Sequence, residues 1–455
     1  MRVTVIGAGY VGAVSAAVLA YLGNRVTCVE REPVRLESWR HRKDPLGEPG
    51  LAQLLMNLSV GVRFVAEPDD LALADVIVVA VGTPMDADGR PDLRQVDAAA
   101  AQIGALAAKD AIVLIRSTVP VGTCDRLQRG ALKDQRVVSN PEFLREGHAL
   151  EDAFFPDRIV AGGPPEARGT VEELYRPITA CRDLPRDLPR GPGPRTTRPI
   201  PFCWMSTVSA ELAKYAANGF LATKISFANE IANLAQAVGA DATDVLGSMG
   251  LDPRIGSQFL RPGLGWGGSC FPKDTRALQI IADGLGYEFL VIRAAIEQNT
   301  RQLRGFASAI ERALAPGSSV GLLGLAFKAG TADTRESPAI ALARLLIQSG
   351  FDVSAYDPAV RDVPEEPKIR VRSAIAEACH AADAVVIATE WPEFAEFDLR
   401  ELRAHTRGDL IFDGRSLISP SRAAAAGFRY AGPAGVIGRA VESAASPRSR
   451  LGTAA

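Results

Sequence analysis

A cysteine in a glycine-rich loop is the first feature of this sequence that could carry chemistry. Four glycines fall within residues 263–268, and Cys270, Pro272 and Lys273 follow them. Glycines let backbone approach a ligand closely, and Pro272 suits the first turn of a helix. A helix N-terminus and the charge of Lys273 are both expected to lower the pKa of the Cys270 thiol. Most cysteines are small buried hydrophobes, but this setting favours a nucleophile.

In a protein that removes a hydride from an alcohol, such a cysteine would allow a second oxidation step. Removal of a hydride from a primary alcohol gives an aldehyde, which a thiol can trap as a thiohemiacetal. A second hydride removal gives a thioester, and water then releases the acid with the help of a general base. Glu142 and Glu146, just after a predicted strand over 137–139, are the candidate carboxylates.

Residues near the start of the chain indicate a binding site for a hydride acceptor. Residues 2–6 predict a buried strand, and Gly7, Gly9 and Gly12 form a G-x-G-x-x-G before an alanine-rich helix over about 13–22. The first glycine permits a tight turn, the second lets backbone approach a pyrophosphate, and the third allows close packing of helix and strand. The helix N-terminus offers N–H groups to the phosphates.

An acid after the next strand strengthens the prediction of NAD. That strand is expected over 25–29 and is followed by Glu30, 18 residues after Gly12. Glu30 can accept hydrogen bonds from the ribose hydroxyls, and its charge repels the 2′-phosphate of NADP. A glycine turn in some other α/β unit is the alternative.

Polar residues follow three further predicted strands, at 75–81, 111–116 and 137–139. With the helical stretches between them, these strands indicate a doubly wound parallel sheet, an α/β fold. Ligands bind at the carboxyl ends of such strands, so Thr83, Thr118 and Glu142 are expected to face one crevice.

The middle of the chain is predicted to be helical. One helix is expected from about 206 to 238, long enough to join two domains and to provide a dimer surface. Glu211, Lys214 and Asn218 fall at i, i+3 and i+7, so they share one face of it. A solvated polar stripe is the simple explanation, and the apolar neighbours of Asn218 count against it.

A second α/β sheet is predicted towards the C-terminus, with strands at 319–325, 353–356, 384–389 and 410–413 and a helix over 338–349. It lacks a full G-x-G-x-x-G, so it is expected to hold a different nucleotide. The expected architecture is two doubly wound Rossmann-like domains joined by a central helical region. The predicted ranges are 1–200 for the dinucleotide domain, 206–300 for the helical domain, 315–431 for the second α/β domain and 432–455 for a disordered tail.

The composition argues against several other classes of protein. The chain has 455 residues and a formal net charge of −2, which gives no general attraction to nucleic acid or to a membrane surface. Neither a secretory signal nor an apolar run of about 18 residues is expected. The six cysteines are scattered, so no metal site or disulfide framework is indicated, and a soluble cytoplasmic protein is expected. Residues 182–201 are rich in Pro and Arg and predict a solvated loop rather than a basic arm for phosphate.

Ten short motifs follow one another in a characteristic order. They are VIGAGYVG at 5–12, VGTP at 81–84, STVP at 117–120, NPEFLREG at 140–147, ELAKYAAN at 211–218, FLRPG at 259–263, GGSCFPKD at 267–274, GLAFK at 324–328, DTRES at 333–337 and FDGR at 412–415. This set, over about residues 1–430, resembles the UDP-glucose/GDP-mannose dehydrogenase family, and within it the UDP-glucose branch.

The resemblance implies a role for each matched residue. Cys270 would be the nucleophile, and Lys214, Asn218 and Asp274 would hold an oxyanion and a water at C6 of the sugar. Glu142 would be the base in thioester hydrolysis, with Thr118 in the same water network. The residues implied for NAD are Gly7, Gly9, Val11, Gly12, Glu30, Arg35, Thr83, Thr118, Glu146, Lys273 and Arg335.

The residues implied for a UDP-sugar form a larger set. They are Glu142, Phe143, Leu144, Arg145, Glu146, Lys214, Asn218, Arg254, Phe259, Leu260, Arg261, Pro262, Gly263, Gly267, Lys328 and Arg415. Arg254 and Arg415 would reach a site in the partner subunit, because family members are dimers or larger oligomers.

The resemblance predicts oxidation of UDP-glucose to UDP-glucuronate with two NAD per turnover. The sequence departs from the family pattern at Glu30, where Asp is usual, at Trp266, where Tyr is frequent, and over 182–201. Three alternatives stay open: a sibling that oxidises GDP-mannose or a UDP-N-acetylhexosamine, a non-catalytic sensor of NAD and nucleotide sugar, and a dehydrogenase that removes only one hydride.

Overall fold

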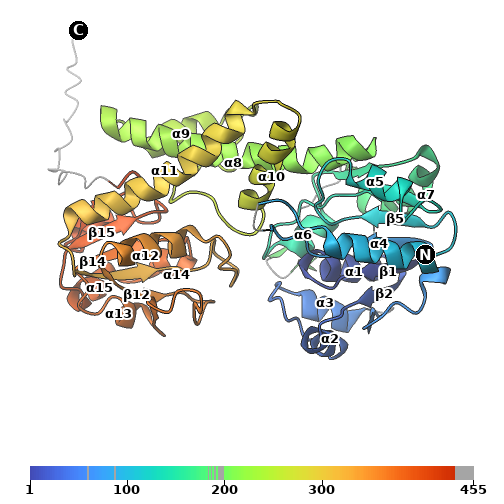
Figure 1. Cartoon of the computed structure of the whole chain (residues 1–455). Helices are drawn as coiled ribbons and strands as arrows, with labels where there is room; N and C mark the ends of the chain where they lie inside the picture. The colour runs from blue at the N-terminus through green and yellow to red at the C-terminus, as the bar shows by residue number, and fades with distance from the viewer. Residues whose placement is uncertain are drawn as a thin grey trace, which may run out of the picture. The chain divides into compact units, whose positions relative to one another are not determined.

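The computed structural model describes residues 1–58, 61–86, 89–182, 184–185, 187–188, 191–192 and 199–435. The chain divides into two compact units, each built around one large sheet (Figure 1). The first unit comprises residues 1–222, 269–293 and 330–332, and the second comprises 223–268, 294–329 and the chain from 333 onward. The predicted α/β class is confirmed.

The sheet of the first unit has eight strands in the order β10-β7-β6-β5-β4-β1-β2-β3. The strands are β1 (Arg2–Ile6), β2 (Arg25–Val29), β3 (Arg63–Val65), β4 (Val76–Val79), β5 (Ile112–Ile115), β6 (Arg136–Ser139), β7 (Ile159–Gly162) and β10 (Phe202–Met205). Strands β1 to β6 are parallel, and the winding reverses between β1 and β4. Strand β7 runs antiparallel to β6. The reversal at β1 and β4 is where a doubly wound sheet binds its ligand.

Alternating side chains of these strands pack against helices on both faces of the sheet. The helices are α1 (Tyr10–Tyr21), α2 (Pro33–Arg40), α3 (Leu51–Asn57), the 3₁₀ turn η1 (Leu71–Leu73), α4 (Arg94–Leu106), α5 (Thr123–Arg129), α6 (Ala149–Phe154) and α7 (Pro165–Thr179). Val3 and Val5 of β1 lie in the core shared with α1, α6 and α7. Ile6 lies in the opposite core, with α4 and α5. Period-2 alternation on β1 thus supplies both layers.

Helix α8 (Thr207–Val238) is close to the predicted range, and its residues 207–222 belong to the first unit. Helix α10 (Phe271–Gly284) and the start of α11 (Leu290–Ala313) belong to the same unit. Within the Pro/Arg-rich segment, β8 (Asp187–Leu188) pairs antiparallel with β9 (Gly191–Pro192). Residues 183, 186, 189–190 and 193–198 of that segment lie outside the described residues.

The sheet of the second unit has six parallel strands in the order β13-β12-β11-β14-β15-β16. They are β11 (Ser319–Leu323), β12 (Asp352–Tyr356), β13 (Arg370–Val371), β14 (Ala384–Ile387), β15 (Leu410–Asp413) and β16 (Arg429–Ala431). The helices that belong wholly to this unit are α9 (Ala242–Gly250), α12 (Pro338–Gln348), α13 (Ile375–Ala378), α14 (Pro392–Glu396), α15 (Leu399–His405) and α16 (Pro420–Ala425). Its strand order is the same as that of β1 to β6 in the first sheet. Strands β13 and β16 are too short to be predicted from the sequence.

A buried aspartate closes the first turn of the second sheet. Asp357, at the end of β12, is fully buried. Its Oδ2 accepts hydrogen bonds from Leu325 N at 2.8 Å and Ala326 N at 3.0 Å. These amides follow β11, where a dinucleotide fold would present N–H groups to phosphate. Helix α12 begins only at Pro338. The second sheet therefore does not offer the phosphate-binding turn of the first.

Two further features concern the ends of the described chain and its helices. Residues 432–435, at the start of the predicted disordered tail, form a turn in which Gln302 Nε2 donates to Pro433 O at 3.0 Å. Residues 436–455 lie outside the described residues. None of the helices in the described part of the chain is long and apolar enough to cross a membrane.

The glycine turn between β1 and α1 has the geometry that its motif predicts. Gly7 has a φ of +100°, which favours glycine. A Cβ added at Gly12 would lie 1.8 Å from Gly7 O, so only glycine lets α1 pack this closely. A Cβ at Gly9 would meet nothing within 4 Å. Gly9 therefore keeps an open face beside the N-terminus of α1.

Alanine at Gly12 and alanine at Gly9 should have different effects. Gly12→Ala should lower the free energy of unfolding by about 1–3 kcal/mol, since overpacking must separate helix and strand, and should abolish NAD binding. Gly9→Ala should leave stability nearly unchanged while weakening NAD binding. Denaturant unfolding and NAD titration measure the two effects, and Gly169→Ala, which also has open space around it, is the control. Equal stability of the Gly9 and Gly12 variants would contradict the packing argument.

Candidate active site

A buried ion pair joins helix α8 to the loop after β6. Lys214 Nζ donates to Glu142 Oε1 at 3.1 Å, and the two residues are 4% and 7% exposed. Glu142 Oε2 accepts from Leu144 N at 2.6 Å. Burial alone would raise the pKa of Glu142, but the Lys214 charge, the Leu144 amide and Arg116 outweigh it, so that pKa is lowered. Glu142 is therefore held as a carboxylate.

The same pairing keeps Lys214 protonated. Burial would lower the pKa of Lys214, but the nearby Glu142, Asp274 and Cys270 raise it above its ordinary value. Lys214 Nζ also lies 5.3 Å from the centre of the Phe143 ring. A buried ammonium group thus stands among two carboxylates and a thiol.

Asn218 extends the cluster by one helical turn. Its Nδ2 donates to Asp274 Oδ2 at 2.6 Å, and Asp274 is only 1% exposed. The other oxygen, Asp274 Oδ1, accepts from Lys273 Nζ at 2.6 Å. Asp274 lies in the first turn of α10, where a carboxylate is favoured by the helix dipole. The predicted catalytic residues of α8 and α10 are therefore in direct contact.

Cys270 is the N-cap residue of α10 and belongs to the same cluster. It keeps solvent-accessible surface, although protein surrounds its thiol on most sides. Its Sγ lies 3.7 Å from Ser269 Oγ. This environment raises the pKa of the Cys270 thiol, chiefly because it is desolvated and because Glu142 and Asp274 are close.

The expectation of a lowered Cys270 pKa is therefore wrong. Lys273, which was expected to lower it, is paired with Asp274. The cation that does lower it is Lys214, which lies 56 positions away in the sequence. The cation that acts on the pKa of Cys270 therefore comes from α8 and is not the neighbouring Lys273.

The face of α8 predicted from the i, i+3, i+7 spacing is buried, not solvated. Glu211, Lys214 and Asn218 are all nearly inaccessible to solvent. Glu211 accepts hydrogen bonds from Gly122 N at 2.6 Å and Cys124 N at 2.7 Å. It therefore caps the N-terminus of α5, a structural role that sequence spacing alone does not distinguish from a catalytic one.

Residues expected at the cofactor line the carboxyl ends of β2, β4 and β5. Glu30 follows β2, is buried, and pairs with Arg35 Nε at 3.3 Å. Thr83 Oγ1 donates to Thr118 O at 2.9 Å, which ties the loop after β4 to the loop after β5. Together with the open Gly9 face and an α1 N-terminus without a side-chain cap, these groups fit a dinucleotide.

Further predicted site residues of the first unit lie in the loop after Glu142. Arg145 pairs with Asp152 at 2.6 Å, and the Arg158 guanidinium lies 3.9 Å from the centre of the Phe143 ring. Ser269 Oγ donates to Glu146 Oε1 at 3.4 Å. Glu146 is thus close to the cysteine loop within the first unit.

Nine of the residues expected at a UDP-sugar belong to the second unit. They are Arg254, Phe259, Leu260, Arg261, Pro262, Gly263, Gly267, Lys328 and Arg415. A Cβ at Gly263 would lie 3.3 Å from Arg415 Nη1, and Arg415 Nη2 donates to Phe327 O at 3.3 Å. Phe259 has a φ of +62°, uncommon for a residue other than glycine. The Phe259–Gly263 loop, Arg415 and the segment before Lys328 therefore gather at the carboxyl edge of the second sheet.

Two arginines differ from this group. Arg335, expected at NAD, belongs to the second unit and pairs with Asp333 at 2.6 Å. Arg254 is exposed and pairs with Asp252 at 2.6 Å, just beyond α9. Neither arginine is part of the Cys270 cluster.

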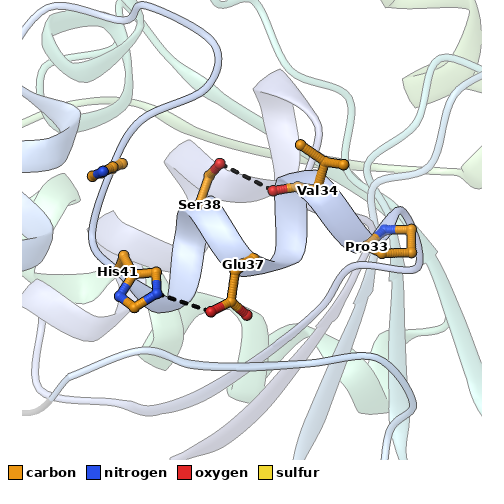
Figure 2. A pocket seen from close by; sticks show the side chains of 6 residues that line it. Pro33, Val34, Glu37, Ser38 and His41 are labelled. Atoms are coloured by element: carbon orange, nitrogen blue, oxygen red, sulfur yellow. Dashed lines mark hydrogen bonds and ion pairs between the residues drawn. The ribbon is translucent and has the colours of Figure 1, made fainter.

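A surface hollow on α2 is unrelated to these residues. Figure 2 shows its lining, in which His41 Nε2 lies 2.8 Å from Glu37 Oε1 and Ser38 Oγ donates to Val34 O at 3.0 Å. These interactions lie within one helix or at its end, and none of the expected site residues lines the hollow. It does not enlarge the candidate active site.

Sequence reasoning missed a second layer of polar residues around the Glu142 loop. Glu48 is buried and accepts hydrogen bonds from Gly147 N at 2.8 Å and Ala149 N at 2.7 Å. Arg116 Nη1 donates to Asn140 Oδ1 at 3.0 Å. Glu48 caps a helix about 100 positions away, so no local pattern marks it.

Comparison with known proteins identifies the family of this arrangement. Residues 1–179 match the NAD binding domain of the UDP-glucose/GDP-mannose dehydrogenase family, residues 208–301 match its central domain, and residues 321–420 match its UDP binding domain. The chain belongs to this family. It is an NAD-dependent oxidoreductase, in agreement with the glycine turn and Glu30.

Similar curated proteins cover almost the whole chain. A UDP-glucose 6-dehydrogenase of Pseudomonas aeruginosa is 41% identical over 95% of this chain and 97% of its own length. UDP-glucose 6-dehydrogenase YwqF of Bacillus subtilis is 40% identical over 94% of this chain and 97% of its own length.

Solved structures of the family share the fold. A UDP-glucose dehydrogenase from the hyperthermophilic archaeon Pyrobaculum islandicum has a TM-score of 0.83 and 36% identity, over 95% of this chain and 97% of its own. A UDP-D-ManNAc dehydrogenase from Pyrococcus horikoshii has a TM-score of 0.81 and 26% identity, over 95% and 99%.

The Lys214–Glu142 pair leads to a stability prediction. Lys214→Met should lower the free energy of unfolding by about 3–5 kcal/mol at pH 7, since it leaves a buried carboxylate without its partner. The lowered Glu142 pKa means that the pair stabilises the fold above the unfolded-state pKa of about 4.3, and that this contribution is lost as the pH falls through the folded-state value. The raised Lys214 pKa sets the opposite limit, with the contribution lost as the pH rises through it.

Denaturant unfolding at pH 7 and at pH 5 tests this. The variant's deficit should be smaller at the lower pH, where the unpaired Glu142 takes up a proton. The double variant Lys214→Met/Glu142→Gln should recover much of the loss. A double variant no more stable than Lys214→Met would contradict the pairing argument.

Proposed function

We propose that this protein oxidises UDP-glucose to UDP-glucuronate through a thioester on Cys270. The observation that carries the proposal is the contact cluster of Cys270 with Lys214, Glu142, Asn218 and Asp274 in one unit. A dehydrogenase that stops at the aldehyde has no need of a nucleophile, a buried cation and a buried base together. NAD, when bound, takes up one hydride in each of the two oxidation steps.

In the first half of the reaction, Lys214 and Asn218 stabilise the oxygen at C6 of the sugar. The buried ammonium of Lys214 supplies positive charge where the alcohol loses its proton to solvent water, and Asp274 holds Asn218 in place. The Cys270 thiol adds to the resulting aldehyde, so that an S–C6 bond forms and the thiol proton passes to the C6 oxygen. This step suits a cysteine that is protonated at rest.

In the second half, another hydride leaves C6 and the hydroxyl proton passes to solvent water, which gives a thioester on Cys270. A water attacks C6 while Glu142 accepts its proton, the C6–S bond breaks, and sulfur leaves as a thiolate that Lys214 stabilises. The lowered pKa of Glu142 keeps it ionised and able to take this proton. Thr118, beside Thr83, is proposed to order that water.

The remaining residue roles are proposals of the same kind. Gly7, Gly9, Gly12, Glu30 and Thr83 would contact NAD, and the open Gly9 face and the buried Glu30 carboxylate support this. In the second unit, Lys328 and Arg415 supply positive charge of the kind that binds a diphosphate.

UDP-glucose is favoured over a sibling substrate by the degree of similarity. The UDP-glucose 6-dehydrogenases above are 40–41% identical to this chain over nearly its whole length, whereas the solved UDP-D-ManNAc dehydrogenase is 26% identical. UDP-glucose is therefore the first substrate to test.

A substrate panel with NADH stoichiometry tests the proposal. UDP-glucose should give two NADH per sugar, whereas GDP-mannose and UDP-N-acetylhexosamines should give little or none. Cys270→Ser should lose net turnover and keep UDP-glucose binding, because the hydroxyl is a far poorer nucleophile. Progress curves with limiting sugar and binding titration supply the measurements.

Each alternative has its own outcome in that experiment. Activity with GDP-mannose but not UDP-glucose would overturn the substrate. One NADH per sugar, with Cys270→Ser still active, would indicate removal of a single hydride. Binding without any NADH would indicate a sensor.

We also propose that the protein is a homodimer or larger homo-oligomer through α8. Phe220, Phe227 and Leu234 recur at intervals of seven residues on this helix and are 65%, 46% and 59% exposed, and Val238 continues the stripe. A heptad-spaced apolar stripe is typical of helix–helix association, and large exposed apolar patches favour a partner. A second copy of the chain offers the matching stripe.

Charges on that stripe should break the oligomer. Phe227→Glu/Leu234→Glu should convert the protein to a monomer, as measured by size-exclusion chromatography with light scattering. Met56→Glu, an exposed apolar residue of α3, is the matched control and should leave the mass unchanged. A wild-type monomer, or a double variant that keeps its oligomeric mass, would contradict the proposal.

A cytoplasmic location is proposed on the state of the cysteines. Among the described residues, Cys28, Cys124, Cys203, Cys270 and Cys379 are free thiols. Thiols are kept reduced in the cytosol, where disulfides are rare, and these free thiols support that location.

A further inference from the structure

One buried carboxylate fastens the loop that carries Glu142. Glu48 Oε1 accepts from Ala149 N at 2.7 Å and Leu150 N at 3.4 Å, and Oε2 accepts from Gly147 N at 2.8 Å. It thereby caps α6 and fixes the last residue of the NPEFLREG motif. The N-cap residue of α6, His148, makes no side-chain cap of its own, so Glu48 supplies what the local sequence lacks.

A tyrosine hydroxyl links that carboxylate to the cofactor turn. Tyr10 OH donates to Glu48 Oε2 and accepts from Gly147 N at 2.6 Å. Burial and the neighbouring Glu48 raise the pKa of Tyr10, so it keeps the proton that it donates. Tyr10 is also the first residue of α1, directly after Gly9 of the dinucleotide motif. The cofactor turn and the Glu142 loop thus share one hydrogen-bonded group.

The other end of the loop is fastened to the same helix. Arg116 Nε donates to Ser15 Oγ of α1 at 2.9 Å, while its Nη1 donates to Asn140 Oδ1 at 3.0 Å. Asn140 and Gly147 bracket Glu142 in the sequence. The loop is therefore anchored to α1 on both sides of Glu142.

We propose that Tyr10 and Glu48 are positioning residues for the hydrolysis step, setting where Glu142 delivers its carboxylate to the attacking water. This inference rests on the function proposed above. Glu142 itself is restrained by Lys214 and by Leu144 N, but neither of these fixes the 145–149 backbone. Loss of the Glu48 anchor frees the Gly147 and Ala149 amides, although Arg145 N stays bonded to Asp152 at 2.7 Å. The resulting shift of the loop displaces the base while leaving Cys270, Asn218 and Asp274 in place.

Such a displacement slows thioester hydrolysis more than the hydride steps. Glu48→Gln replaces one of two accepting oxygens by an amide donor, which opposes backbone N–H groups at Gly147 or Ala149. Tyr10→Phe removes only the hydroxyl and keeps the ring. The first variant should lower kcat by about 100-fold, as an ångström-scale misplacement of a catalytic group does, and the second by about tenfold.

Rapid mixing of each variant with UDP-glucose and excess NAD tests the step that is affected. A burst approaching two NADH per subunit should precede the slow steady state. Acid-quenched protein should carry a covalent sugar-nucleotide adduct on Cys270, detected by intact mass, in larger amount than the wild type. Hydroxylamine, which cleaves thioesters, should raise the steady rate of both variants.

Two matched variants control for general effects. Tyr21→Phe removes a hydroxyl from the other end of α1, where Tyr21 packs edge-on against Phe154. Asp398→Asn weakens another carboxylate cap, which accepts from Arg400 N at 2.8 Å at the start of α15. Both controls should retain wild-type kinetics.

The outcomes separate this inference from the proposed function. A wild-type protein that does not form two NADH per UDP-glucose overturns the function and the inference with it. A normal wild type, with folded variants whose first NADH slows as much as steady turnover and which gain neither adduct nor hydroxylamine response, overturns the positioning role alone. If Glu48→Gln does not fold, Tyr10→Phe decides the matter by the same readouts.

Discussion

The ion pair between Lys214 and Glu142 is the constraint on which the active-site architecture depends. Two opposite charges are stable in a buried place only when each compensates the other and further hydrogen bonds satisfy them. The Leu144 amide completes the shell of Glu142, and Asp274 adds negative charge near Lys214. Because the pair joins α8 to the end of β6, it places a helix from the middle of the chain against the dinucleotide sheet.

That arrangement divides the tasks among charged groups that stand close together. Lys214 remains a cation, Glu142 an anion and Cys270 a thiol, because the pKa of Lys214 is raised, that of Glu142 is lowered and that of Cys270 is raised. A protonated cysteine fits addition to an aldehyde, and an ionised glutamate fits attack by water. Glu142 and Asp274 disfavour the thiolate at rest, whereas the Lys214 charge favours it and so helps sulfur to leave.

The two sheets show how one winding supports two different sites. In the first, glycines leave the turn after β1 open and Glu30 stands at the end of β2. In the second, the acid at the end of β12 is the buried Asp357, which accepts hydrogen bonds from the amides of Leu325 and Ala326. Equivalent topology therefore gives one dinucleotide turn and one turn closed by the protein itself.

The sequence by itself determined the fold class, nine strands of the two sheets and the glycine turn of the NAD binding domain, but it did not predict β3, β7, β10, β13 or β16. The features that it determined are local properties: period-2 alternation, glycines at fixed spacing, and an acid at a fixed distance. Tertiary structure decided which groups meet. Lys214 and Glu142 are 72 positions apart, and Glu48 and Gly147 are 99 apart, so no local pattern links them. It also decided that the charge of Lys214, rather than that of Lys273, lowers the pKa of Cys270. A pKa depends on burial and on charges in space, not on neighbours in the chain.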